Sequence, residues 1–336
     1  MNTKIEISIK TILFTVALLV GFWLVIQIRD ILFLLFIAFL LMTAIYPLVV
    51  FLERFRIPRA IGILLVYIVV IGFFGLSLVS AVPALIAQST KLTQVLPTVV
   101  TKILPYWNID FTVLTQQVAP LGENLLRVTF GIFSNIASIV TILVFTFYFL
   151  LERRHAEAIL KEIIGDVAAK QSMDLLRVIE CRLGSWVRGE LLLMTSVTIL
   201  SYIGLTILRV DFALPLAILA GLLELVPMIG PTISAIPAVL VALAMSPFLA
   251  LCVIALYFIV QQVENNLLVP AIMKKSVGFS PIITIVSLLI GGRLAGIVGA
   301  ILSVPVVLVL QVVVSTFMKK TIETPEKIRT KNPSKA

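Results

Sequence analysis

Two glutamates and one arginine interrupt an otherwise apolar part of this sequence, and their types and spacing could support chemistry. Glu224, Glu264 and Arg293 lie between positions 212 and 318, where a lysine pair at 274–275 supplies the remaining charge. An acidic residue at the centre of a bilayer costs about 2.5–3.5 kcal/mol to insert, so it is expected to face a partner or a water-filled cavity. Ionisable residues at that depth are typical of proton relays, ion sites and substrate contacts.

Glu224 lies beside a strong break in helical structure. A helix that starts at the preceding charge, 13 residues upstream, carries this carboxylate about 20 Å inward, past the middle of a hydrocarbon core about 30 Å thick. The sequence PMIGP follows, with Pro227, Gly230 and Pro231. Proline removes a helical hydrogen bond and glycine allows the backbone to reverse. The pattern therefore predicts helix, break and helix.

Glu264 belongs to a polar cluster, QQVENN, within an apolar segment. The cluster contains Gln261, Glu264, Asn265 and Asn266, which precede the lysine pair by 8 to 13 residues. In a helix that spacing is about 12–20 Å, which places the cluster well inside a bilayer. We expect Glu264 to bind a cation or a proton together with Glu224, and the amide side chains to add polar contacts.

A second broken segment begins at residue 281 and repeats the order of the first. Both contain a proline, an apolar run, a charge beside a break, an apolar return and a second proline. The second break and its return contain Gly291, Gly292, Arg293 and Gly299. The returning arms, ISAIPAVLVAL and AILSVPVVLVL, are bent by Pro237 and Pro305 respectively. Breaks that enter from opposite faces and coordinate substrate or ions are typical of inverted-repeat transporters. We expect the glycines to permit close backbone approach, and Arg293 to pair with a carboxylate or an anionic solute.

Each of these features also has a purely structural explanation. Pro237 and Pro305 are compatible with simple kinks. If the two hairpins are instead pairs of full spans, Glu224 lies at a membrane boundary and Arg293 lies in a loop. Glu264 with its asparagines is compatible with a clamp between helices or subunits. The joint occurrence of charges and breaks favours a translocation site over any one of these explanations.

The elements that must position these residues are predicted to be membrane helices. Of the 336 residues, 60% are hydrophobic and 13% are charged, against about 25% charged in soluble domains. A helical span needs about 20 apolar residues. Such runs occur at 11–28, 31–52, 60–82, 128–151, 191–208 and 248–273. We predict an all-α polytopic membrane protein with about six full transmembrane helices and two broken helical hairpins entering from opposite faces, about eight membrane segments in all.

Polar segments divide the chain into six parts. They are three N-terminal transmembrane helices (1–82), an extracytoplasmic helical segment (83–127), a transmembrane helix (128–151), a cytoplasmic amphipathic helical region (152–190), a C-terminal transport core with both hairpins (191–318) and a basic cytoplasmic tail (319–336). Segment 152–190 holds seven basic residues and 83–127 only three, which favours both termini in the cytoplasm and insertion in the cytoplasmic membrane. The apolar stripe at 175–187 suits a helix that lies on the membrane surface or one that packs on another helix.

Other functional classes receive no support from the sequence. The net charge of +9 follows from basic loops and tail, and no nucleic-acid partner is predicted because no basic patch alternates with exposed aromatics. Cys181 and Cys252 are too far apart in the sequence to form a metal motif, and a solvated role is expected for His155. No phosphate-binding loop, zinc-protease motif or serine elbow is present. We predict neither an enzyme nor a bound metal or cofactor.

Three C-terminal motifs resemble the AI-2E transporter family, which contains autoinducer-2 exporters and many uncharacterised permeases. They are LVPMIGPTISAIPAVLVAL, ENNLLVPAIMKKSVGFSP and LLIGGRLAGIVGAILSVPVVLVLQVVV. The N-terminal spans and RIPRAIGILLVYIV fit the same pattern, so the resemblance covers essentially the whole chain. It implies a permease or exporter of the inner membrane that carries a small solute or a cation and forms a homo-oligomer, pentameric in the family.

The family motifs fall on particular residues of this chain. The P-x-x-G-P motif falls on Pro227, Gly230 and Pro231, and the acidic motif on Glu264, Asn266 and Pro270. The glycine-rich ending falls on Gly291, Gly292, Gly296, Gly299 and Pro305. Members often have Asn or Thr where this chain has Glu224, and this difference favours cation or proton coupling. Some members are assigned sodium or lithium/proton antiport, which is the first alternative to solute export. A non-transporting scaffold or a passive channel is the second.

Overall fold

The computed structural model of this chain describes residues 9–72, 75, 136–227, 229–273 and 281–329. Within these ranges every regular element is a helix. Four of the described helices are long and apolar enough to cross a membrane, and a fifth span results if one bent pair is counted. The all-α prediction is therefore confirmed for the described residues, whereas the predicted total of about eight segments is not. The predicted segment 83–127 lies outside the described residues.

The N-terminal helices form one packed group with α5. Helix α1 (Ile9–Gln27) is exposed along almost its whole length, and α2 (Arg29–Arg54) packs beside a shorter helix at Arg59–Gly72 and α5 (Ile136–Glu152). The buried side chains of Val49, Ile63 and Leu150 fill the space between them. The Tyr67 hydroxyl donates to the Leu143 carbonyl at 2.8 Å, so a buried polar group keeps a partner.

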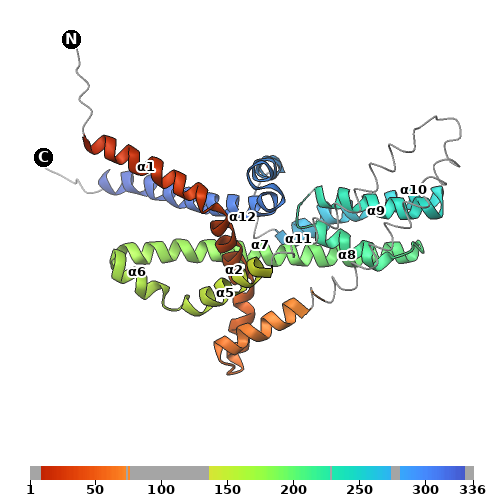
Figure 1. The fold of residues 1–336 in the computed structure, drawn as a ribbon, viewed down its shortest axis with the longest axis horizontal. Coiled ribbons are helices and arrows are strands. Elements are labelled where there is room, and N and C mark those ends of the chain that lie inside the picture. Colours follow the sequence, from red (N-terminus) through yellow and green to blue (C-terminus); the bar gives the residue numbers. More distant parts are fainter. Residues whose placement is uncertain (1–8, 73–74, 76–135, 228, 274–280, 330–336) are drawn as a thin grey trace, which may run out of the picture.

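Helix α7 (Asp166–Ile207) is the central element, and it runs 42 residues without interruption. Its N-terminal half lies beside α6 (Ala156–Ile164), and its C-terminal half lies beside α8 and α10 (Figure 1). The charge pattern predicts a boundary between residues 190 and 191, and the helix continues across it because this stretch contains no proline. The predicted stripe includes Leu183 and Trp186, which are buried against α2 and α12. The structure thus favours helix packing over a location on the membrane surface.

The first predicted break is present in the structure. Helix α8 (Ala213–Leu223) ends one residue before Glu224, and α9 (Ile229–Met245) starts two residues after Pro227. A Cβ atom at Gly230 would collide with the Leu223 carbonyl, so only glycine lets the two helices meet this closely. With 11 and 17 residues, the helices extend about 16 and 25 Å, less than a full bilayer core.

The next span changes its helical type at the predicted polar cluster. Helix α10 (Pro247–Val263) passes into a π-helix, η1 (Glu264–Leu268), and then into α11 (Val269–Met273). Buried residues of α7, α8, α9 and α10 form one apolar cluster that includes Leu205, Leu216, Ala238 and Val253. This cluster holds the first hairpin against α7 and α10.

Helix α12 (Pro281–Arg329) contains a break near the second predicted one, but it lies after Arg293 rather than at the Gly291–Arg293 stretch. Its backbone leaves helical geometry at Ala295 and Gly296, where φ is −142° and +59° respectively. The arms on either side approach so closely that a Cβ atom at Gly291 would collide with the Gly299 carbonyl, and the reverse also holds. The structure therefore contains both predicted interruptions, the second of them shifted to Ala295 and Gly296.

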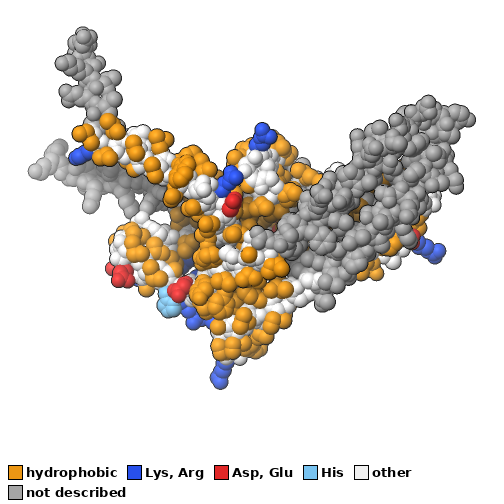
Figure 2. Space-filling model, viewed as in Figure 1, with side chains coloured by type: hydrophobic (Ala, Val, Ile, Leu, Met, Phe, Trp, Pro, Cys, Tyr) orange, Lys and Arg blue, Asp and Glu red, His pale blue; other side chains and the backbone are white. Residues whose placement is uncertain are grey.

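The surface of the described helices is strongly apolar. Figure 2 shows hydrophobic side chains over most of the visible described surface, with few charged groups between them. Large apolar residues on α1, α10 and α12 are more than half exposed, among them Trp23, Phe248 and Leu294. Soluble proteins rarely expose continuous apolar surfaces of this kind, whereas a bilayer solvates them. The fold is that of a multi-pass membrane protein.

Candidate functional site

Three buried acidic side chains from separate elements lie near one another inside the helical core. Among the described residues no group of three or more His, Cys, Asp or Glu side chains is arranged to hold a metal ion. Glu224 at the end of α8 is 2% exposed, and Glu264 at the start of η1 and Glu190 of α7 are each 4% exposed. The carboxyl groups of Glu224 and Glu264 lie within hydrogen-bonding reach of each other. Glu190 interacts electrostatically with both Glu264 and Glu224. We call Glu190, Glu224 and Glu264 the carboxyl cluster.

The helix breaks explain how these carboxyl groups reach one another. Glu224 occupies the position where α8 stops, and the close contact of Gly230 with Leu223 keeps that end of α8 against α9. Glu264 begins the π-helix, whose extra residue per turn changes the direction of the side chains that follow. Single-turn π-helices are frequent at functional sites. Glu224 and Glu264 therefore each lie at a departure from regular helix, whereas Glu190 lies within the uninterrupted α7.

Few hydrogen bonds from neighbouring residues compensate for the burial of the carboxyl cluster. The Gln261 amide donates to Glu264 Oε2 at 3.4 Å, and Glu224 Oε2 is buried with no hydrogen-bond partner among the described residues. Like charges repel strongly in a low-dielectric interior, and a buried carboxylate needs a partner. A bound proton or a bound cation would supply that partner.

The remaining predicted residues of the first hairpin and of the polar cluster take different positions. Gly230 and Pro231 are buried at the break, and Pro227 is half-buried there. Asn265 and Asn266 are exposed, and the Asn266 amide donates to the Gln262 carbonyl at 2.9 Å. The three predicted kink positions lie inside helices: Pro237 in α9, Pro270 in α11 and Pro305 in α12.

A separate cavity lies between the two arms of α12 at the second break. An apolar cavity of about 480 Å³ is lined by both arms of α12, including Gly291 and Gly299, and by Phe33 of α2. The carboxyl cluster contributes nothing to its lining. Arg293 is exposed and forms no ion pair with the described residues, and Gly292 is half-buried beside it. The structure thus brings Gln261, Glu224 and Glu264 together but does not bring Arg293 or the α12 glycines to them.

Comparison with known proteins identifies the family of this chain. Residues 12–319 match the model of the AI-2E family transporter. The chain belongs to the AI-2E transporter family. This agrees with the resemblance of its C-terminal motifs, and it makes the protein a member of a family of membrane transport proteins.

Several relatives in the AI-2E transporter family align over most of their length. YrrI of Bacillus subtilis (strain 168), a candidate transport protein, is 29% identical over 90% of both chains. YueF of the same organism, also a candidate transport protein, is 32% identical over 77% of both chains. The AI-2 transport protein TqsA of Escherichia coli (strain K12) is 27% identical over 79% of this chain and 80% of its own. These are similarities to named transport proteins, and they establish the kind of protein but not its substrate.

Glu190 is the member of the carboxyl cluster that sequence reasoning missed. It ends the charged segment 152–190, so it does not stand out in the sequence as Glu224 and Glu264 do. A signal was nevertheless present. Leu183, Trp186 and Glu190 recur at steps of three and four residues, so Glu190 continues the buried stripe of α7 rather than its polar face. An acid on the apolar stripe of a helix is a candidate for a buried site.

Proposed function

We propose that this AI-2E family protein is a secondary transporter in which the carboxyl cluster binds the coupling proton or cation. The observation that carries the proposal is the convergence of three buried acids from α7, α8 and η1. Acidic residues inside membrane bundles are expensive and serve by default as ion or proton sites. The absence of a nucleotide-binding loop in the sequence agrees with a secondary mechanism.

Polar groups beyond the carboxyl cluster extend along the same two helices. Ser201 and Tyr257 are buried, and their hydroxyl oxygens have no hydrogen-bond partner among the described residues. Ser201 follows Glu190 by 11 residues and Tyr257 precedes Glu264 by seven, so each hydroxyl shares a helix face with its acid. This row of unpaired polar groups between α7 and α10 supports a hydrated or proton-conducting path that begins at the cluster.

The proposed topology keeps about six full spans and two broken hairpins in the cytoplasmic membrane, with both termini inside. The short lengths of α8 and α9 and the reversal within α12 support two re-entrant segments. A homo-oligomer is part of this proposal on the ground of the family resemblance of the motifs.

Two cargoes are consistent with such a site. One is a small organic solute, as the name of the relative TqsA indicates for that protein. The other is sodium or lithium exchanged for protons, and the buried acid Glu224 at a position where family members often have Asn or Thr supports this exchange. We place cation/proton antiport first for the experiment because the carboxyl cluster makes a direct prediction for it.

The test uses purified full-length protein in liposomes that contain a pH-sensitive dye. An inward sodium or lithium gradient should drive proton efflux in the wild type, and Glu224→Gln and Glu264→Gln should each abolish it because an amide cannot exchange a proton. Asp211→Asn is the matched control, since Asp211 is an exposed acid just before α8. It should retain wild-type flux.

Three other outcomes separate the competing functions. Silence of a verified, correctly oriented wild type with both ions would overturn antiport and direct the assay to uptake of organic solutes with a proton gradient. Flux that continues without a coupling gradient and does not saturate would indicate a passive channel. Wild-type flux in both glutamine variants would remove the carboxyl cluster from the mechanism.

A further inference from the structure

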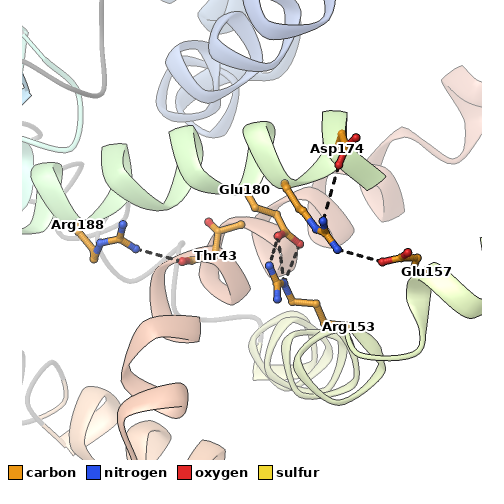
Figure 3. A network of polar contacts seen from close by, with 7 residues as sticks. Thr43, Arg153, Glu157, Asp174, Glu180 and Arg188 are labelled. Carbon is orange, nitrogen blue, oxygen red and sulfur yellow. Dashed lines mark hydrogen bonds and ion pairs between the residues drawn. The ribbon is translucent and has the colours of Figure 1, made fainter. Parts of the chain in front are cut away.

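A second cavity, separate from that of α12, lies at the crossing of α2, α7 and the turn that connects α5 to α6. It has a volume of about 210 Å³. Three of its lining residues are arginines, and Figure 3 shows the network of polar contacts around them. The remaining lining consists of Met42, Thr43, Tyr46, Pro47, Glu180 and Cys181. We call this cavity the arginine pocket, and it is separate from the carboxyl cluster.

One wall of the arginine pocket is a closed ion pair. Arg153 Nη2 lies 2.6 Å from Glu180 Oε2, and Arg153 Nε donates to both oxygens of that carboxylate at 3.1 Å. The guanidinium also lies over the Tyr46 ring, 3.9 Å from its centroid. Burial lowers the pKa of Arg153, but the hydrogen bond and charge of Glu180 outweigh burial and raise it. The only acid in the pocket lining is therefore neutralised by this pair.

Arg188 has a different environment because its partners carry no charge. Pro47 lacks an amide hydrogen, so the Thr43 carbonyl of α2 loses its usual helical donor. Arg188 Nη1 donates to this carbonyl at 3.3 Å (Figure 3). Its Nη2 donates to Ser185 Oγ at 3.3 Å. No carboxylate among the described residues pairs with it. Arginine has five N–H donors in a planar fork, so Arg188 keeps both its charge and free donors.

Arg177 completes the cationic lining at the rim. It pairs with Glu157 at 3.0 Å and with Asp174 at 3.7 Å, and 56% of its side chain is exposed. Neither acid lines the pocket. Exposed pairs of this kind contribute little stability and exchange partners readily, so Arg177 is available to a ligand that enters the pocket.

We propose that the arginine pocket binds an anionic phosphate group, carried by a phospholipid or free in solution. Arginine forks match phosphate oxygens in charge and geometry. The volume is below the roughly 300–1,000 Å³ of pockets that bury drug-sized ligands, so the pocket suits one headgroup-sized anion rather than a whole organic substrate. Apolar walls from Met42 and Pro47 suit the first carbons beyond a lipid phosphate. The proposal is independent of the transport mechanism.

The test measures thermal unfolding of the purified full-length chain in detergent. Phosphatidylglycerol is compared with phosphatidylcholine, whose phosphate is balanced by choline, and inorganic phosphate is compared with chloride at equal ionic strength. A ligand that binds the folded state raises Tm. We expect phosphatidylglycerol or phosphate to raise Tm of the wild type, and Arg188→Gln to lose most of that rise.

Matched variants keep the outcome interpretable. Arg182→Gln removes an exposed arginine of the same helix that does not line the pocket, and it should keep the full rise. Arg188→Lys should keep part of it, because the charge remains but the fork is lost. If Arg188→Gln fails to fold, Arg177→Gln at the rim takes its place. A rise with phosphatidylglycerol alone identifies a lipid, and a rise with phosphate identifies a free anion. The proposal is overturned if neither phosphatidylglycerol nor phosphate raises the Tm of the wild type. It is also overturned if Arg188→Gln keeps the same rise in Tm as Arg182→Gln.

Discussion

At the residue scale, the carboxyl cluster is a set of acids that no ordinary core would retain. Each member is at most 4% exposed, and the Gln261 amide donates a long hydrogen bond of 3.4 Å to Glu264. Burial of like charges opposes folding unless a proton or cation is bound. The cluster therefore costs stability, and neutral replacements should separate this cost from its proposed role in transport.

We predict that Glu190→Gln lowers cation-driven proton flux at least about tenfold, which corresponds to about 1.4 kcal/mol on the limiting step. The same change should leave Tm equal to or above that of the wild type, because it removes repulsion from the cluster. Dye-monitored flux in liposomes and thermal unfolding provide the two readouts. Glu162→Gln, which changes an exposed acid of α6, should alter neither. Wild-type flux in Glu190→Gln would show that this acid has no part in coupling.

At the element scale, the two helix breaks depend on close contacts at glycines, and the first break positions Glu224. Helix α8 ends at the break before α9, and α12 reverses at Ala295 and Gly296. In both places the contact distance between helical arms is set by glycine. Small residues of this kind let backbones approach inside membranes, where the hydrophobic effect between helices is absent.

We predict that Gly291→Ala destabilises the protein by about 1–3 kcal/mol, because its methyl group would collide with the Gly299 carbonyl on the opposite arm. The neighbouring Gly292→Ala is the matched control. A Cβ atom there would meet only the Ala300 Cβ atom at 4.0 Å, an ordinary contact. Thermal unfolding of the two variants in the same detergent measures the difference. Equal Tm values would show that the arms of α12 do not pack at these glycines.

At the scale of the whole molecule, α7 connects the two polar regions. The middle of the helix contributes Glu180 and Arg188 to the arginine pocket, and Glu190, two residues after Arg188, belongs to the carboxyl cluster. The helix is unbroken between them. The orientation of α7 in the membrane therefore determines the face on which the arginine pocket opens.

We predict that Cys181 is labelled from the cytoplasmic side. It is an exposed residue of α7 in the basic-rich segment, which the positive-inside rule places in the cytoplasm. With Cys252→Ser as background, a membrane-impermeant maleimide should label inside-out vesicles and leave right-side-out vesicles unlabelled. Labelling in the opposite pattern would reverse the proposed topology.

The sequence by itself determined the composition-driven and local features of this protein. Its apolar runs predicted an all-α membrane protein, and its glycines and prolines predicted both breaks, because backbone constraints at these residues act locally. The motifs also pointed to the correct family. Glu224 and Glu264 could be named in advance because an isolated acid in an apolar run is conspicuous.

Only the tertiary structure decided which of these features meet. It joined Glu190 to Glu224 and Glu264 across α7, α8 and η1, and it placed Arg293 and the α12 glycines elsewhere. It also showed that α7 continues through the expected boundary at residue 190. Contacts between distant segments depend on helix packing and register, which no local pattern encodes. The partners of a buried charge are therefore known only once the helices are assembled.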